Sequence, residues 1–469
     1  MVFSSLIFLF AYLPLTLACY FLSPRRWKNA VLFLCSLLFY GWSEPIYLFL
    51  MLASISSAYG FGFLIWRNRD QNPRRARLWM WLSVGVSLSF LFFFKYYNFF
   101  AENLSRLLFL TVPMLDGLRL PIGISFYTFQ IISYTVDLWR KNCRLQRNYV
   151  SFGAYVTLFP QLVAGPIVRY SDVDHDLTAR RETLSDFSQG ALRFSVGLSK
   201  KVLLGDPLAA AYLYCRSMAT LTPTTLGAWM VALFFTLHLY YDFSGYSDMA
   251  IGLGRMLGFH FPENFNYPYI ARSITEFWRR WHISLSTWFR EYIYIPLGGN
   301  RRGRGRTYLN LAVVWILTGL WHGADWNFVL WGAYFCLILI LEKAFLLRML
   351  QKAPRLLQHL YAFSLVTVGF VIFSHADLSE LGSRLLQMIG MGGVVPTDGR
   401  ILYRLHTILP LLLIALVGAT PIPKRIWQRC CARFSLAETL SPIFSLALLF
   451  VSTAYLVDST YSPFAYTQF

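Results

Sequence analysis

The chain has 469 residues, of which 56% are hydrophobic, 18% are aromatic and only 14% are charged. This composition excludes an ordinary soluble enzyme, in which about a quarter of the residues are charged. The net charge of +19 would suit nucleic-acid binding if the basic residues formed one surface, but they stand in short runs between apolar segments. We therefore expect a helical membrane protein that binds no nucleic acid.

Apolar segments follow one another from the N-terminus onward. Since a helix needs about 20 residues to cross the hydrocarbon core, we count roughly ten to twelve membrane segments, some of them re-entrant. The fold class is all-α and polytopic. The first segment precedes the basic run 25–28 and lacks the positive region of a cleaved signal peptide. The seven cysteines show no metal-ligand spacing.

The basic runs also predict the orientation of the segments, because cytoplasmic loops are rich in Lys and Arg. The runs at 67–77, 140–147, 348–355 and 424–433 are assigned to the cytoplasm. The spans between them then place both termini outside the cytoplasm. The C-terminal tail, 458–469, is therefore predicted to be extracytoplasmic.

The middle of the chain contains a segment that no regular helix accommodates. The stretch YVTLFPQLVAGPIVRY carries Pro160, Gly165 and Pro166, which break a helix. Irregular backbone at membrane depth is tolerated where it is buried in protein or lines a cavity. No internal repeat or linker is apparent. We expect one integral-membrane domain over 1–469 with its core at 120–345.

Residues 273–292 are predicted to form one helix. Ser273 and Glu276 have the spacing of a capping box. On a helical period, one polar stripe holds Arg279, His282, Ser286 and Arg290. An interfacial helix whose arginines contact lipid headgroups is the alternative. That alternative accounts poorly for a histidine in the middle of the stripe.

A second histidine, His322, follows eleven mostly apolar residues, 311–321. At helical rise these residues span about 16 Å, which would place the imidazole near the middle of the membrane. Trp321 precedes it directly. A buried structural histidine is the alternative interpretation. An intramembrane imidazole that takes a proton near neutral pH is also a functional candidate.

Four stretches together resemble a known family: PIGISFYTFQIISYTVDLWR, YYDFSGYSDMAIGLGRMLGF, FWRRWHISLSTW and the LWHG segment. They resemble the membrane-bound O-acyltransferases, and most closely the alginate O-acetyltransferase branch. The resemblance covers nearly the whole chain and implies a funnel-like membrane fold. It also implies that His322 is the essential catalytic residue and that His282 is the second recurring histidine.

Acyl transfer from a thioester to a hydroxyl needs a base for the hydroxyl proton, which a neutral histidine supplies. No G-x-S-x-G or H-E-x-x-H motif occurs, so direct attack with His322 as the base is the simplest mechanism. We expect no catalytic metal and no bound cofactor, with acetyl-CoA as the donor substrate. Whether His282 orients the acceptor, polarises the carbonyl or supports the site stays open.

Arginines beside these segments are candidates for binding the phosphates of acyl-CoA. For any single arginine, a topological anchor on the cytoplasmic side is an equal alternative. The donor-binding candidates are Arg279, Arg280, Arg301, Arg302, Arg304 and Arg306.

Polar residues in the YYDFSGYSD stretch are unusual for a membrane segment, where carboxylates are costly. We expect them, with Trp321, to line the acceptor passage or to support the histidines. They are Asp242, Ser244, Tyr246 and Asp248.

The C-terminal SPFAYTQF resembles the aromatic tail of polymer-modifying family members, which implies that Tyr466 accepts the acyl group outside the cytoplasm. Thr467 replaces the second aromatic of that pattern, and a membrane-interface anchor is the alternative.

The leading functional interpretation is a bacterial inner-membrane acyltransferase. It would move an acetyl group across the bilayer for O-acetylation of an exported or cell-wall polysaccharide. Its expected partners are acyl-CoA, membrane lipids, the polysaccharide and a periplasmic or cell-surface acetyltransferase. The alternatives are D-alanyl transfer to teichoic acid in the same fold, with a carrier-protein donor, and a transporter or flippase.

Overall fold

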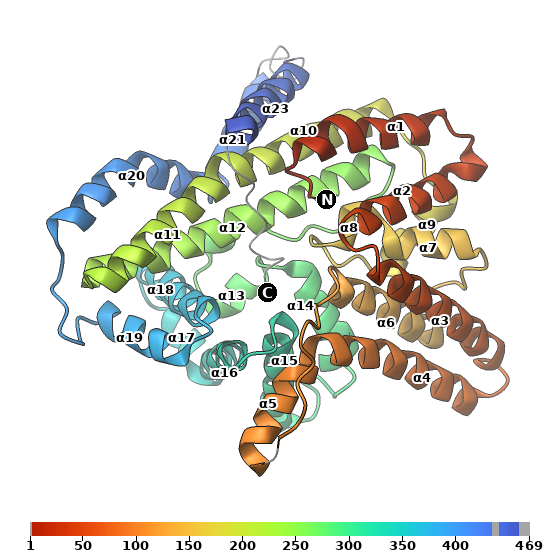
Figure 1. Ribbon diagram of the computed structural model, residues 1–469, viewed down its shortest axis with the longest axis horizontal. Helices are drawn as coiled ribbons and strands as arrows, with labels where there is room; N and C mark the ends of the chain where they lie inside the picture. Colours follow the sequence, from red (N-terminus) through yellow and green to blue (C-terminus); the bar gives the residue numbers. More distant parts are fainter. Residues whose placement is uncertain (1, 110, 434–439, 459–469) are drawn as a thin grey trace. The chain divides into compact units, whose positions relative to one another are not determined.

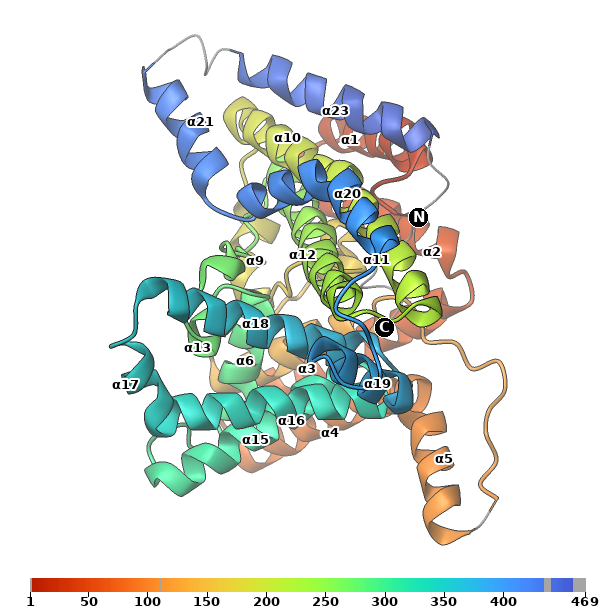
Figure 2. The same cartoon turned by 90° about the vertical axis from the view of Figure 1, so that its left-hand side faces the viewer.

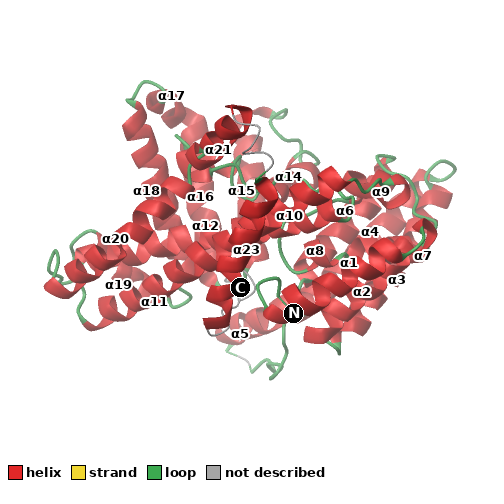
Figure 3. Ribbon diagram, turned by 90° about the horizontal axis from the view of Figure 1, so that it is seen from above, coloured by secondary structure: helices red, strands yellow, loops and turns green. Residues whose placement is uncertain are grey.

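The structure is a computed structural model that describes residues 2–109, 111–433 and 440–458. Helices and connecting loops make up the described part, and no named β-strand occurs in it (Figure 3). One isolated β-bridge joins Thr224 to Val395. The expected all-α fold is confirmed.

The chain forms two compact units, which are described separately. Unit 1 contains the residues up to Phe194 together with Ser247–Pro262, and unit 2 contains Ser195–Tyr246 together with the residues from Glu263 onward. Helices α10 (Leu184–Ser199) and α12 (Thr225–Met256) contribute residues to both. The expectation of a single integral-membrane domain stays a prediction.

Unit 1 is built around long antiparallel helices, and α3, α4 and α6 lie side by side in it (Figure 1). Its α-helices are α1 (Leu13–Leu22), α2 (Lys28–Ser43), α3 (Tyr47–Asn68), α4 (Pro73–Leu91), α5 (Tyr97–Leu108), α6 (Ile124–Arg140), α7 (Tyr149–Thr157), α8 (Phe159–Leu162) and α9 (Tyr170–Ala179). Short π or 3-10 segments are η1 (Phe8–Tyr12), η2 (Arg25–Trp27) and η3 (Phe92–Tyr96).

Unit 2 carries a hairpin of two helices, α15 and α16, with α18 alongside α16 (Figure 2). Its α-helices, besides most of α12, are α11 (Asp206–Leu221), α13 (Ile274–Trp278), α14 (Ile283–Phe289), α15 (Gly303–His322), α16 (Trp326–Leu341), α17 (Leu347–Leu350), α18 (Arg355–Ser374), α19 (Leu378–Met388), α20 (Gly399–Gly418), α21 (Ile422–Arg433) and α23 (Ser441–Asp458). Its short π or 3-10 segments are η4 (Lys200–Gly205), η5 (Pro268–Ile270), η6 (Arg290–Tyr294) and η7 (Glu342–Leu346).

Seven helices of the described chain are long and apolar enough to cross a membrane, and Phe8–Leu22 is a shorter apolar helix. The seven are Tyr47–Asn68, Pro73–Leu108, Thr225–Met256, Trp326–Leu350, Arg355–Ser374, Gly399–Gly418 and Ser441–Asp458. The apolar window of Thr225–Met256 is 83% buried, whereas that of Ser441–Asp458 is 6% buried. The first is therefore enclosed almost entirely by protein, whereas the described protein covers little of the second.

The segment around Pro160 is irregular, as the sequence predicts. Helix α7 ends at Thr157, α8 spans only four residues, and non-helical chain leads from Val163 to Arg169. Nearly all of this stretch is buried, which is the condition under which irregular backbone is tolerated at membrane depth.

Two glycines let the hairpin of α15 and α16 close tightly. A Cβ on Gly319 would lie 2.3 Å from the carbonyl oxygen of Phe328, and one on Gly332 would lie 2.4 Å from that of Trp315. Such spacing is shorter than any real carbon contact, so only glycine allows this approach. Small residues play this role at many helix contacts in membranes. The close crossing sets the end of α15 beside Trp331 of α16.

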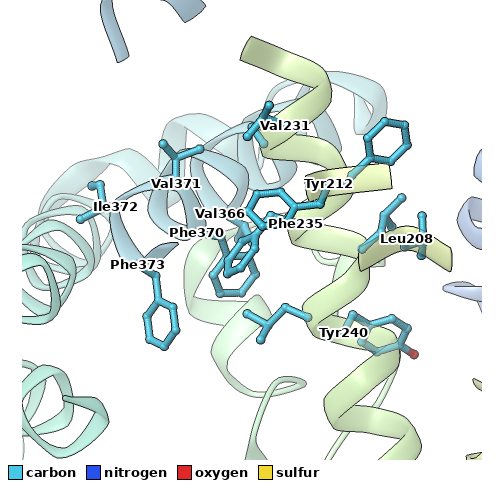
Figure 4. Close-up of a cluster of buried hydrophobic side chains, with 14 of the residues drawn as sticks. Leu208, Tyr212, Val231, Phe235, Tyr240, Val366, Phe370, Val371, Ile372 and Phe373 are labelled. Atoms are coloured by element: carbon cyan, nitrogen blue, oxygen red, sulfur yellow. The ribbon is translucent and has the colours of Figure 1, made fainter. Parts of the chain in front are cut away.

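The core of unit 2 contains aromatic and aliphatic side chains of several helices, among them α11, α12 and α18 (Figure 4). Leu208 and Tyr212 come from α11, Phe235 and Tyr240 from α12, and Phe370 from α18, and all five are buried. Each such side chain contributes about 1.5–3 kcal/mol of burial free energy relative to an aqueous environment. This core holds α12 and α18, which both reach the candidate site.

Candidate active site

His322 is the last residue of α15, whose first residue is Gly303. The 20 residues of the helix rise about 28 Å between the first and last Cα atoms. The apolar residues 311–321 form the second half of this helix, and the depth of His322 in the membrane stays a prediction. The helix begins within the basic run itself and not at the apolar stretch, so His322 and Arg302 lie at opposite ends of α15.

Three aromatic rings enclose the imidazole of His322. The ring centroids lie 5.0 Å from Trp321, 5.0 Å from Trp331 and 5.3 Å from Phe373, each in an edge arrangement. The residue is 8% exposed. A ring in this environment experiences a low local dielectric, which strengthens any proton transfer or polar contact that it makes.

His282 does not lie in a continuous helix, so the predicted helix over 273–292 is wrong. Helix α13 ends at Trp278, α14 begins at Ile283, and His282 between them has a left-handed φ of 44°. The chain turns here because backbone hydrogen bonds join it to a second loop. The amide of Asn266 donates to the carbonyl of Arg280 at 2.9 Å, and the amide of Ile283 donates to that of Asn264 at 3.0 Å.

The turn buries His282, which is 1% exposed. Arg279 and Arg290, which were expected on the same stripe, stay exposed. The N-terminal cap of the segment is as predicted, because the Ser273 hydroxyl oxygen accepts from the amide of Glu276 at 3.0 Å. In the predicted capping box the Glu276 carboxylate would accept from the amide of Ser273. It accepts instead from the amide of Arg272, one residue earlier.

Asn264 orients the ring of His282. Its Oδ1 lies 3.1 Å from His282 Nδ1, 2.8 Å from Ser284 Oγ and 3.3 Å from the amide nitrogen of Ser284. A backbone amide only donates, so the amide atom that faces it is the oxygen. His282 therefore donates from Nδ1 to this oxygen, and Nε2 is the acceptor nitrogen of the neutral ring.

Burial keeps His282 uncharged. Desolvation lowers the pKa of its imidazole to about 3, so the ring is neutral throughout the physiological pH range. Phe243 of α12 packs edge-on against it with centroids 4.8 Å apart. His282 thus presents one defined tautomer in a fixed position.

Trp321 contacts both histidines. Its ring centroid lies 6.0 Å from that of His282 and 5.0 Å from that of His322. The structure thus places the two predicted catalytic residues and Trp321 in one cluster, although His282 and His322 are 40 positions apart in the chain. Two buried imidazoles in an aromatic enclosure are suited to moving a proton while water is excluded.

The polar residues of α12 lie in the protein interior. Asp242 is fully buried and pairs with the buried Lys201 at 3.0 Å, and Lys201 also bonds Asp206. This pairing satisfies a carboxylate that would otherwise be costly at membrane depth. It holds α12 against η4, one residue from the Phe243 that contacts His282.

The other three members of this group are distributed over both units. Ser244 and Tyr246 are buried in unit 2. Asp248 belongs to unit 1, where it accepts from Arg193 at 2.9 Å. The ion pair with Arg193 explains the charge of Asp248 structurally. A role in the passage of the acceptor stays a prediction.

The predicted donor-binding arginines divide into three sets. Arg301 and Arg302 line a pocket of about 510 Å³ together with Arg290. Arg304 and Arg306 are exposed on the first turn of α15, and Arg306 Nε donates to the Leu297 carbonyl at 3.4 Å. Arg279 is exposed, and Arg280 pairs with Glu276 at 2.8 Å.

Two predictions, the acyl carrier Tyr466 and the absence of a catalytic metal or cofactor, are not tested by the structure. Tyr466 lies outside the described residues. In the described ranges, no group of three or more His, Cys, Asp or Glu side chains is placed to hold a metal ion. That the reaction uses neither metal nor bound cofactor stays a prediction.

Asn264 is the residue of this site that sequence reasoning missed. It stands in PENFNYP, which has no helical or strand period and no known motif. A buried histidine needs a partner for a ring nitrogen, so a partner was implied, but not its position. The same applies to Phe373, which reaches His322 from α18.

Comparison with known proteins identifies relatives along the whole chain. The family model described as MBOAT, membrane-bound O-acyltransferase family, matches residues 10–374. A probable alginate O-acetylase of Azotobacter vinelandii is 46% identical over 401 residues, covering 85% of this chain and 80% of that protein. One of Pseudomonas putida is 40% identical over 488 aligned positions and covers 100% of both chains. A peptidoglycan O-acetyltransferase of Helicobacter pylori is 34% identical, covering 84% of this chain and 81% of that protein.

Proposed function

Because this chain belongs to the membrane-bound O-acyltransferase family, we propose that it moves an acetyl group from cytoplasmic acetyl-CoA across the membrane for O-acetylation of an exported polysaccharide. Membership of an acyltransferase family sets the transporter alternative aside. Acetyl is favoured over D-alanyl as the group transferred, because relatives named for O-acetylation are 34–46% identical whereas teichoic acid D-alanyltransferases are 26–28% identical over 54% of this chain. Alginate is the acceptor proposed first, because it stands in the names of relatives that are 40–46% identical.

One observation carries the proposal, namely the cluster in which Trp321 contacts both His282 and His322. We assign the general base to His322, which is the more exposed of the two histidines. His282 is held by Asn264 as a neutral ring and is assigned a supporting role. A positioned base contributes about 10²- to 10⁴-fold to such a rate.

The chemical step balances with these residues alone. The acceptor hydroxyl oxygen attacks the thioester carbonyl carbon while His322 takes the hydroxyl proton. The new C–O bond forms, the C–S bond breaks, and the thiolate of CoA takes the proton back from the imidazole. The base is thus returned to its neutral form.

The donor is proposed to enter at the arginine end of α15. Arg290, Arg301 and Arg302 surround the pocket there, and guanidinium groups bind phosphates in bidentate geometry. His322 lies about 28 Å away along the helix. A donor that is held by its phosphates has to extend toward His322 along α15.

Tyr466 is proposed as the first acceptor of the acetyl group. Its phenolic hydroxyl would take the place of the acceptor in the step above and form an aryl ester. A periplasmic or cell-surface acetyltransferase would then pass the acetyl group to the polymer. This proposal rests on the tail motif in the sequence and on an extracytoplasmic C-terminus in a bacterial inner membrane.

Complementation of a deletion strain tests the proposal. The measured quantity is base-released acetate on the exported polysaccharide. The native chain and His406→Ala, a change at an exposed histidine of α20, should restore acetylation. His322→Ala and Tyr466→Phe should not. Full acetylation with His322→Ala would refute the assigned base, and full acetylation with Tyr466→Phe would remove the tail from the pathway.

A further inference from the structure

Unit 1 contains a cationic cleft that the proposed reaction does not use. It measures about 720 Å³ and is lined by residues from the ends of α3 and α6, the loop after α6, and α9. Four of its lining side chains are cationic: Arg69, Lys141, Arg144 and Arg147. Asp174 is the one carboxylate among the lining residues. The cleft therefore carries an excess of positive charge.

Two of the four cations already have polar partners within the protein. Lys141 Nζ lies 2.6 Å from the carboxylate of Asp70. Arg69 donates to the carbonyl of Leu138 in the last turn of α6, at 3.2 Å. Both cations lie at helix C-termini, where positive charge is favourable. These two side chains are explained without a ligand.

Arg144 and Arg147 are different. Both are exposed, and neither forms an ion pair with any residue that the structure describes. The guanidinium of Arg147 lies over the ring of Trp66, 5.4 Å from its centroid. This cation–π contact orients the group and leaves its N–H donors available at the ring edge.

The loop that carries these two arginines is held in place from inside. Cys143 and Gln146 are both buried. The Gln146 side chain donates to the Tyr170 hydroxyl at 3.2 Å, and its backbone amide donates to the Tyr134 hydroxyl at 3.3 Å. The alternation of buried and exposed residues directs Arg144 and Arg147 outward at fixed positions. The cleft is thus preorganised for an anion.

We propose that this cleft binds the phosphate of an anionic phospholipid headgroup. Helix α3 is a candidate membrane span, and its last turns expose Phe63 and Trp66 beside the cleft. Tryptophan at a helix end is typical of the membrane–water interface. Acyl chains can lie along exposed α3 while the phosphate contacts Arg144 and Arg147. A soluble phosphate would leave this apolar surface uncovered.

Native mass spectrometry of the detergent-solubilised full chain tests the proposal with phosphatidylglycerol and phosphatidylcholine as probes. Arg144→Gln/Arg147→Gln should weaken phosphatidylglycerol binding about 30-fold, on the scale of interfacial basic residues, and should leave phosphatidylcholine binding unchanged. Arg25→Gln/Arg26→Gln is the matched control, because this exposed pair lies in unit 1 outside the cleft. The control should bind phosphatidylglycerol like the native chain, and thermal unfolding should show that both variants are folded.

Three results would overturn the proposal. Unchanged phosphatidylglycerol binding in the cleft variant would show that the arginines do not contact the lipid. An equal loss in both variants would show only a general effect of charge. Displacement of the lipid by millimolar inorganic phosphate or CoA, with loss of CoA binding in the cleft variant, would assign the same phosphate chemistry to a soluble ligand instead.

Discussion

The hydrogen bonds around Asn264 provide the sharpest test of how the site is organised. Substitution of Asn264 by Ala removes the oxygen that accepts from His282 Nδ1 and from the amide and hydroxyl of Ser284. The ring of His282 then has no fixed tautomer. Its left-handed backbone also loses the side chain that stabilises it. We expect lower activity and lower stability.

The magnitude follows from the number of donors left unsatisfied. A buried donor without its acceptor costs about 1–3 kcal/mol. Loss of the His282 bond alone should therefore reduce the rate about 10- to 100-fold, since each 1.36 kcal/mol is a factor of ten. The three lost bonds together should reduce the free energy of unfolding by at least about 3 kcal/mol.

The assay measures acetyl transfer from radiolabelled acetyl-CoA to Tyr466 of the purified enzyme. Thermal unfolding is measured on the same sample. Ser284→Ala is the matched control, because it removes one bond to the same oxygen and leaves the His282 bond intact. Asn264→Asp keeps the acceptor and lacks the amide donor. If His282 donates to this side chain, Asn264→Asp should retain more activity than Asn264→Ala.

Two results would refute this reasoning. A folded Asn264→Ala enzyme with the native rate would show that the bond does not organise the site. Equal losses of rate in Asn264→Ala and Ser284→Ala would mean that both substitutions act through stability alone.

Two further predictions concern the ends of α15. Arg301→Gln/Arg302→Gln should raise the KM for acetyl-CoA about tenfold with little change in kcat, which is the scale of one charge-assisted hydrogen bond. Arg304→Gln is the control and should leave the KM unchanged. An unchanged KM in the double variant would remove this pocket from donor binding. Gly319→Ala should lower the free energy of unfolding by about 1–3 kcal/mol, because its Cβ meets the carbonyl oxygen of Phe328. Gly305→Ala, in open space on the same helix, should not lower it, and equal thermal midpoints for the two alanine variants would contradict the tight crossing of α15 and α16.

Much of the helical architecture was predictable because apolar length and basic loops are local signals. Helix α18 follows the basic run 348–355, and α20 and α23 lie on either side of the run 424–433, so the basic runs mark the ends of these apolar helices. The break near Pro160 was predictable for the same reason. The number of membrane segments was less predictable. Roughly ten to twelve were expected and seven helices are long and apolar enough, because short and broken helices in the middle of the chain do not reach the length of a span.

The conformation of the site was less predictable, because it depends on contacts between distant parts of the chain. Its two histidines stood out because an imidazole is unusual in apolar sequence. The period of residues 273–292 nevertheless predicted one helix, since periodicity takes no account of a partner loop. Hydrogen bonds to Asn264 and Asn266, distant in the pattern, favour the turn at His282. Tertiary pairing here overrides helix propensity.

The most direct test of the account is thioester cleavage by the purified enzyme and transfer of the label from radiolabelled acetyl-CoA to its own Tyr466. Native enzyme and His322→Ala are compared, with His406→Ala as the control. We predict that His322→Ala, folded to the native thermal midpoint, loses about 10²- to 10⁴-fold in rate and that His406→Ala keeps the native rate. A native rate in His322→Ala would contradict its assignment as the base, and absence of cleavage in every form would contradict acetyl-CoA as the donor.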